Sequence, residues 1–357
     1  MKAFVFEDAG RIAVAEVPEP RVERPDEVLL RPLSVGICFT DKHAYDGWLH
    51  PSFQKGQIFG HEGSAVVVEA GPESGLAVGD RVAVLPISGC GECEVCKAGF
   101  ATRCREAGRW MPHMEAELLT APGRACFRIP DAVGDVAGAC IESLTCGVRA
   151  VRNSGITLAD NVLVLGGEDY ALAAAQAARD AGAAQVVVAD PLPVRRAVAE
   201  RLGTVALDPV DPGFAKTVAD LMPFGADQVF LSQENYIPTS SQYLRQACEL
   251  LRLQGTVNVL RAHGEHGLGE IPGFLPWAKE ITIRHHGVFF GEEPARGGRP
   301  RGDFQVTIDA VAKGSLDGEA HVSRIVPFDD VRAAADFDDI YASLPAGESK
   351  VLFRISR

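Results

Sequence analysis

Residues 161–190 read NVLVLGGEDYALAAAQAARDAGAAQVVVAD. Two apolar runs in this stretch, Asn161–Leu165 and Gln185–Ala189, have the length and composition of buried strands. Between them, the segment Ala171–Ala181 is rich in alanine, the residue with the highest helix propensity. The order strand, helix, strand predicts a βαβ unit.

The alternation of strands and helices continues toward the C-terminus. Asp227–Leu231 and Gly255–Leu260 are strand-like, and Thr239–Leu251 between them is helical in pattern. This order predicts a parallel, doubly wound sheet of the Rossmann type. The polar stretch Gly291–Gly302 is rich in Gly and Pro, so we expect an exposed loop or hinge before a helix at Asp303–Gly314.

The first 130 residues have a different pattern. Short strand-like runs such as Glu27–Arg31, Gly63–Ala70 and Arg81–Leu85 are separated by Gly and Pro. They predict a β-rich, barrel-like domain. The length of 357 residues is sufficient for two domains, each with its own core.

Composition restricts the class of function. A hydrophobic fraction of 46% with 23% charged residues is typical of a globular protein, and no apolar run is long enough to span a bilayer. The net charge of −13 disfavours binding to nucleic acid or an anionic membrane and favours a small-molecule substrate. Met1–Glu7 alternates like a strand and lacks the features of a signal peptide, so we expect a cytoplasmic protein.

The chain has nine cysteines, and four of them are clustered. Residues 89–104 read GCGECEVCKAGFATRC, which brings Cys90, Cys93, Cys96 and Cys104 into one short loop. Four thiolates at this spacing predict a structural zinc site, because a tetrahedral sulfur shell leaves no position open for a substrate. Unligated free thiols and an iron–sulfur cluster are the alternatives.

Several short motifs occur in an order that resembles the zinc-dependent medium-chain alcohol dehydrogenase family. They are Gly36–His43, Gly60–Glu62, Gly79–Val82, the cysteine cluster and Ile141–Ser143. The resemblance covers essentially the whole chain. It implies a GroES-like catalytic domain formed by residues 1–150 and 297–357, with a zinc lobe at 89–105. Residues 151–296 would form the Rossmann domain, with the substrate cleft between the two domains. A homodimer or homotetramer is common among such relatives.

The same resemblance implies a catalytic zinc ion bound by Cys38, His61 and Glu142, which makes two zinc ions per chain. Three ligands and an open position suit a Lewis acid. Glu62 would enter the ligand shell when water or substrate leaves, and Asp41 would orient the ring of His61. The alternatives are that Cys38 is a core residue and that Glu142 is a charge at the start of a helix.

Further roles also follow from the resemblance. Thr40 and His43 would relay the proton of the substrate hydroxyl group to solvent. The adjacent histidines His285 and His286 either line the substrate pocket or face solvent or an interface. The remaining cysteines match no ligand position and are expected in the core: Cys126, Cys140, Cys146 and Cys248.

The turn after the first strand of the βαβ unit departs from the dinucleotide-binding pattern Gly-x-Gly-x-x-Gly. It reads Gly166-Gly167-Glu168-Asp169-Tyr170-Ala171, so only the first glycine of the pattern is kept. Glu168 puts bulk and negative charge where a diphosphate would lie. It would also allow a carboxylate to take the anion site at the start of the helix.

Three more positions bear on the cofactor. Phe39 replaces a glycine or basic residue of the relatives, and residues 232–235 (SQEN) replace a small, Gly-containing turn. In contrast, Asp190, followed by Arg195, stands where the adenine ribose is bound in the family, which favours NAD over NADP. The alternative for Asp190 is a helix N-cap before Pro191.

The resemblance implies zinc-dependent oxidation of a secondary alcohol with NAD, on a polyol, a sugar or a natural-product intermediate. The altered turn favours an alternative: a non-redox enzyme that keeps zinc as a Lewis acid for elimination, cyclisation or isomerisation. A third alternative, a catalytically silent binding protein on the same fold, is disfavoured by the complete set of metal ligands.

Overall fold

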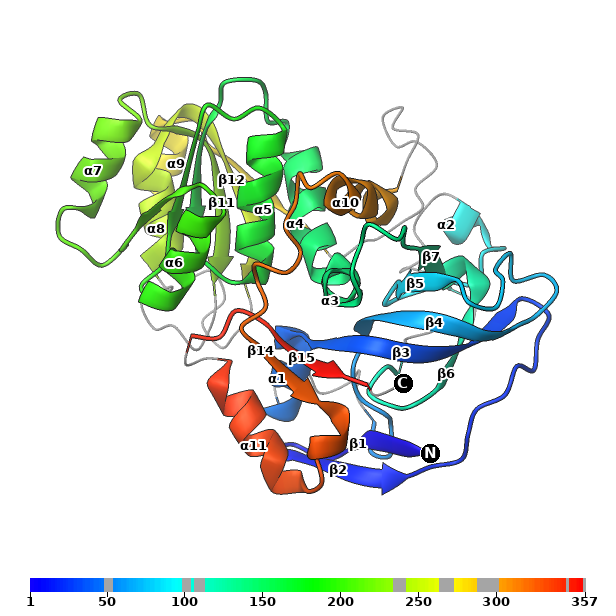
Figure 1. Ribbon diagram of the computed structural model, residues 1–357. Helices are drawn as coiled ribbons and strands as arrows, with labels where there is room; N and C mark the ends of the chain where they lie inside the picture. The colour runs from blue at the N-terminus through cyan, green and yellow to red at the C-terminus, as the bar shows by residue number, and fades with distance from the viewer. Residues whose placement is uncertain are drawn as a thin grey trace.

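The computed structural model describes residues 1–47, 54–97, 104–105, 113–233, 242–262, 273–287, 302–344 and 347–355. Two large β-sheets form the centres of two parts of the molecule (Figure 1). Helices surround the first sheet, whereas the second is built mostly from the N-terminal strands and is closed by strands from the C-terminal end.

The first sheet is parallel and has the strand order β10-β9-β8-β11-β12-β13. The order reverses direction beside β8, as in a doubly wound Rossmann sheet, and this confirms the fold class expected from the sequence. Its strands are β8 (Asn161–Leu165), β9 (Gln185–Ala189), β10 (Val205–Leu207), β11 (Ala226–Gln233), β12 (Leu251–Ala262) and β13 (Thr282–His285).

Helices connect these strands and bury the apolar faces of the sheet. In α5, the alanines that favour a helix also allow close packing on α4, where a Cβ atom at Gly147 would lie 2.5 Å from the Ala174 nitrogen. The helices of this part are α4 (Ile141–Ser154), α5 (Asp169–Asp180), α6 (Pro193–Arg201), α7 (Phe214–Leu221), α8 (Tyr243–Leu250), α9 (Phe274–Ala278) and α10 (Asp303–Ala312).

The second sheet has the order β14-β15-β3-β4-β5-β7, with β6 also paired to β3. Apart from the parallel pair β14 and β15, its neighbours are antiparallel. The strands are β3 (Glu27–Ile37), β4 (Glu62–Ala70), β5 (Arg81–Val84), β6 (Leu119–Pro122), β7 (Cys126–Arg128), β14 (Arg324–Pro327) and β15 (Val351–Arg354). The GroES-like, β-rich architecture expected from the resemblance is confirmed.

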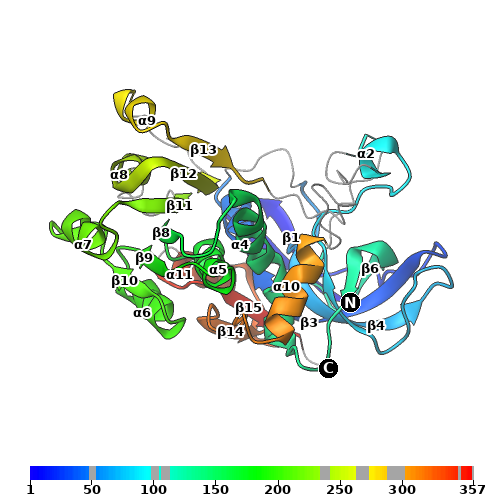
Figure 2. The ribbon, with the colours of Figure 1, turned by 90° about the horizontal axis from the view of Figure 1, so that it is seen from above.

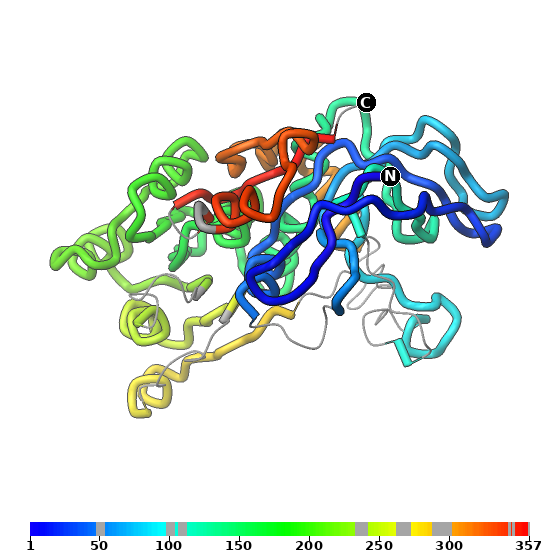
Figure 3. Tube along the Cα trace, turned by 90° about the horizontal axis from the view of Figure 1, so that it is seen from below, coloured from blue at the N-terminus to red at the C-terminus, as the bar shows by residue number. Residues whose placement is uncertain are grey.

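Smaller elements complete this part. The strands β1 (Lys2–Asp8) and β2 (Arg11–Glu16) form a separate hairpin. Both ends of the described chain lie in the β-rich part, as Figure 3 shows. The helices are α1 (Phe39–Tyr45), α2 (Glu94–Lys97), α3 (Asp135–Ala139) and α11 (Ala334–Ser343), with 3-10 turns at Gly123–Ala125 and Phe328–Asp330.

Most strands and helices expected from the sequence occur within a few residues of their expected bounds. The expected loop at 291–302 falls almost entirely outside the described residues, and so does the expected domain boundary at 297. The start of the helix expected at 239–251, and Glu234 and Asn235, also lie outside them. The C-terminal strand β15 pairs with β3, and β14 pairs with β15, so C-terminal strands extend the sheet of the N-terminal strands (Figures 1 and 2). Within the described residues, no helix has the length and apolar character required to cross a membrane.

Candidate metal centres and cofactor site

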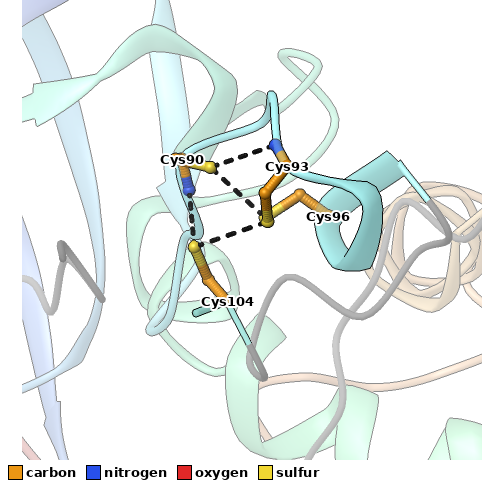
Figure 4. Close-up of side chains that lie close together, drawn as sticks. All are labelled: Cys90, Cys93, Cys96 and Cys104. Carbon is orange, nitrogen blue, oxygen red and sulfur yellow. Dashed lines mark hydrogen bonds between the residues drawn. The ribbon is translucent and has the colours of Figure 1, made fainter. Parts of the chain in front are cut away.

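The cysteine cluster lies in a lobe around α2, on the opposite side of the molecule from α7 (Figure 1). The sulfur atoms of Cys90 and Cys96 are 3.9 Å apart, as are those of Cys93 and Cys104 (Figure 4). Backbone N–H groups point at two of these sulfurs: Cys93 N donates to Cys90 Sγ at 3.3 Å, and Cys90 N to Cys104 Sγ at 3.4 Å.

These distances fit a metal site. A tetrahedron with Zn–S bonds of about 2.3 Å has sulfur–sulfur edges of about 3.8 Å. Backbone hydrogen bonds, first of all that from Cys96, lower the pKa of the Cys93 thiol to about 6, whereas burial raises the pKa of the Cys96 thiol to about 12, so a thiolate is favoured at Cys93. The four ligand atoms lie within 4.8 Å of one another. The cluster therefore has the donors and the spacing of a closed, structural zinc site.

A second group of ligand atoms forms where the two parts of the molecule meet. Cys38 precedes α1, His61 precedes β4, and Glu142 lies in the first turn of α4. Their ligand atoms all lie within 4.8 Å of one another, and the three residues are buried. Residues that are about a hundred positions apart in the sequence thus converge, as the resemblance implies.

Two local features hold His61 in place. Gly60 has φ of +78°, and a Cβ atom there would lie 2.7 Å from Glu115 Cγ, so glycine allows the sharp entry into β4. The Asp41 carboxylate accepts a hydrogen bond from His61 Nδ1 at 2.9 Å, which leaves Nε2 as the metal-binding atom. Although burial lowers the pKa of His61, Asp41 and Cys38 together raise it well above its usual value.

Glu142 provides the test of whether these residues suit a metal ion. Its side chain is 3% exposed, and its Oε2 atom has no hydrogen-bond partner among the described residues. Burial, and then the charges of Glu62 and Cys38, raise the pKa of Glu142 well above its usual value. A divalent cation would satisfy this oxygen and neutralise the cluster of negative groups, so the donor set fits zinc.

The other expected catalytic residues lie close to this group. Thr40, Asp41 and His43 are on α1, with Asp41 and His43 buried and Thr40 partly exposed. Glu62, next to His61, forms a buried ion pair with Lys350. Among the remaining cysteines, Cys126, Cys140 and Cys248 are buried as expected, and Cys146 is partly exposed.

Two residues near this metal group were not identified from the sequence. The Tyr170 hydroxyl lies 3.7 Å from Cys38 Sγ. Glu115 is fully buried, its two carboxyl oxygens have no hydrogen-bond partner among the described residues, and burial raises its pKa well above the usual value. No local motif marks either residue, because each becomes a neighbour of the metal ligands only through the tertiary fold.

The turn between β8 and α5 is occupied by the chain's own charges. Glu168 is the N-cap residue of α5, and its Oε2 atom accepts a hydrogen bond from Ala171 N at 3.1 Å. Its other oxygen accepts from the Ser232 hydroxyl. Gly166 has φ of +115°, and a Cβ atom there would lie 2.8 Å from the Ser232 carbonyl oxygen, so this one glycine of the pattern is required sterically.

The two residues expected at the adenine ribose also interact with groups of the protein itself. Asp190 and Arg195 are fully buried, 3.5 Å apart at their closest charged atoms. Asp190 Oδ1 accepts a hydrogen bond from Leu192 N at 2.8 Å. The N-cap residue of α6 is Leu192, so the alternative that Asp190 is the helix N-cap is wrong. His285 is exposed, whereas His286 is partly buried and donates from Nε2 to Asn258 Oδ1 at 3.0 Å.

The fold and the two ligand groups define a zinc-binding enzyme of the alcohol dehydrogenase type. Comparison with protein families agrees: residues 24–131 match the alcohol dehydrogenase GroES-like domain, and residues 171–313 match the zinc-binding dehydrogenase domain. The chain belongs to the zinc-dependent alcohol dehydrogenase family of medium-chain dehydrogenases, which are oxidoreductases.

Individual relatives are similar over different lengths. Scyllo-inosose 3-dehydrogenase of Thermotoga maritima is 33% identical over 58% of this chain, a match that spans 60% of the relative's own length. 2-dehydro-3-deoxy-L-galactonate 5-dehydrogenase of Pseudoalteromonas atlantica is 29% identical over 84% of each chain. A protein of Sinorhizobium meliloti 1021 assigned to the zinc-binding dehydrogenases, solved with NADP bound, has a TM-score of 0.81 and 28% identity over 99% of this chain and 98% of its own.

Proposed function

We propose that the protein is a zinc-dependent enzyme that oxidises a secondary alcohol of a polyol, a sugar or a natural-product intermediate. The observation that carries this proposal is the convergence of Cys38, His61 and Glu142 within 4.8 Å, with one Glu142 oxygen left without a hydrogen-bond partner among the described residues. The named relatives, which act on inosose and on a sugar acid, support the substrate class.

Each residue of this group has a proposed role in zinc binding or proton transfer. Cys38, His61 and Glu142 would hold the zinc ion, which when bound supplies Lewis-acid polarisation of a substrate oxygen. Asp41 fixes the His61 ring through their 2.9 Å hydrogen bond. The hydroxyl of Thr40 and the imidazole of His43 lie on the same short helix and would carry the substrate's proton away from the buried site.

The sequence predicts NAD as the hydride acceptor, preferred over NADP because of Asp190, and this remains a prediction. The turn at Glu168 and Asp169 does not fit a dinucleotide, because the start of α5 already binds the chain's own carboxylates. Oxidation of the alcohol to a ketone removes a hydride from its carbon and a proton from its hydroxyl group, so this candidate requires NAD or another two-electron acceptor bound outside that turn. The same observation favours a second candidate function, a redox-neutral elimination, cyclisation or isomerisation at the same metal group.

One experiment separates the two candidates. Zinc-replete protein is incubated with a panel of polyols, sugars and the corresponding ketones, with and without NAD or NADP, and products are followed by NMR. Product that forms only with a nicotinamide supports the oxidoreductase. Zinc-dependent product without any nicotinamide supports the redox-neutral enzyme. A Cys38→Ser variant that turns over as fast as wild type would contradict both.

A further inference from the structure

The first turn of α5 is the place where a Rossmann-type fold binds a diphosphate, because helix N–H groups without partners and the helix dipole attract an anion there. In this chain two carboxylates already lie at that turn. Glu168 accepts from Ala171 N at 3.1 Å, and Asp169 Oδ1 accepts from Tyr170 N at 2.9 Å. Both side chains are at most 2% exposed.

Buried cations compensate these carboxylates. Arg261, at the end of β12, lies 3.6 Å from Asp169, and Lys350 lies 3.2 Å from the other oxygen of Asp169. Although burial raises the pKa of Asp169, Lys350 and Arg261 lower it, so the carboxylate is ionised. Arg261 and Lys350, the basic groups shown beside this turn, are therefore engaged with acidic side chains of the same chain.

A cation and two aromatic rings lie between this turn and the metal ligands. The Arg261 guanidinium lies 4.1 Å from the centre of the Tyr170 ring and 4.9 Å from the centre of the Phe39 ring, an arrangement in which the cation stacks on aromatic faces. Arg261 is 3% exposed and Tyr170 is 4% exposed. Because the Tyr170 hydroxyl contacts Cys38, this stack extends from α5 to the candidate zinc ligands.

We propose that Glu168 and Asp169 permanently take the anion site of α5, and that this chain does not hold a nicotinamide dinucleotide there. The two carboxylates serve as an internal substitute for the diphosphate: they accept from the helix N–H groups and pair with Arg261 and Lys350. This inference does not depend on the substrate of the proposed function, and it is tested by binding rather than by turnover.

The experiment is calorimetric titration of the zinc-replete, full-length protein with ADP-ribose and with NADH. ADP-ribose carries the adenosine and the diphosphate without a nicotinamide, so its binding is independent of any contact to the nicotinamide ring. We expect dissociation constants above about 0.1 mM for both ligands with wild-type protein. Glu168→Gly should tighten ADP-ribose binding by at least about tenfold, equivalent to ~1.4 kcal/mol, because one buried negative charge is removed from the diphosphate position.

Controls keep the result interpretable. Glu168→Gln removes the charge with little change of shape and should also tighten the binding of ADP-ribose. This variant keeps the test possible if Glu168→Gly does not fold. Glu200→Gln removes a charge from an exposed position on α6 and should leave the affinity unchanged. Low-micromolar binding of either ligand to wild type would overturn the proposal. So would an unchanged affinity in the folded Glu168 variants and in Glu168→Gly/Asp169→Gly.

Discussion

The Lys350 ammonium group, next to β15, lies 3.2 Å from the Asp169 carboxylate in the first turn of α5 and also pairs with Glu62 at the start of β4. One buried cation thus joins the β-rich sheet to the parallel-sheet part of the molecule. Lys350 is 1% exposed, and despite burial the two carboxylates raise its pKa well above the usual value. Its charge holds together groups that would otherwise repel each other.

Replacing Lys350 with Met should therefore lower the free energy of unfolding by about 3–5 kcal/mol, because two buried carboxylates lose their shared partner. Urea unfolding measures the change. Lys216→Met is the matched control, since its ion pair with Asp220 is exposed and should contribute little. A loss from Lys350→Met as small as that of the control would show that the buried charges are compensated elsewhere.

Metal analysis should find two zinc ions per chain in metal-replete protein, one for each ligand group. Cys93→Ser should lose one ion together with much stability, because a structural zinc contributes directly to folding. Cys38→Ser should lose the other ion and the activity while the fold survives. A ratio of one ion or fewer in the native protein would contradict the assignment of the Cys38 group.

Asp41→Asn should weaken zinc binding at the Cys38 group by about 10–100-fold, because it loses the carboxylate that orients His61 and raises its basicity. Competition with a chromophoric chelator measures this affinity. The cysteine cluster in the same variant serves as the internal control, and its affinity for zinc should equal that in wild type. If wild type and Asp41→Asn bind zinc equally tightly at the Cys38 group, Asp41 does not strengthen the binding of zinc by His61.

Stability should also fall in mild acid through His321. Burial lowers its pKa to about 4, and its Nε2 atom accepts a hydrogen bond from Gln176 Nε2 at 2.8 Å, so the folded protein keeps this ring neutral. Below about pH 6.5 the unfolded chain binds a proton that the folded chain does not, so folding loses about 2 kcal/mol between pH 7 and pH 5.

His321→Asn should remove that part of the pH dependence, which is measured as the free energy of unfolding at the two pH values. The exposed His285 offers the comparison, and His285→Asn should leave the dependence as in wild type. An unaltered slope in His321→Asn would show that the ring is already protonated in the folded protein.

The order of strands and helices followed directly from the sequence. Strands β8 and β9 have the bounds that their apolar runs indicate, because strands buried on both faces are continuous hydrophobic runs. The cysteine cluster is equally local, since its four ligands lie within one short loop. For the Cys38, His61 and Glu142 group, the family motifs indicated the residues, but nothing in the spacing required them to meet.

What the tertiary structure alone decided is where the Glu168 carboxylate points. The sequence showed that Glu168 departs from the glycine pattern, but a carboxylate at that position is able to face solvent or the helix. Its direction depends on Ser232 and Arg261, which are distant in the sequence and adjacent only in the folded sheet. Long-range charge compensation has no periodicity or spacing in the sequence, because buried ion pairs form wherever the fold brings opposite charges together and excludes water.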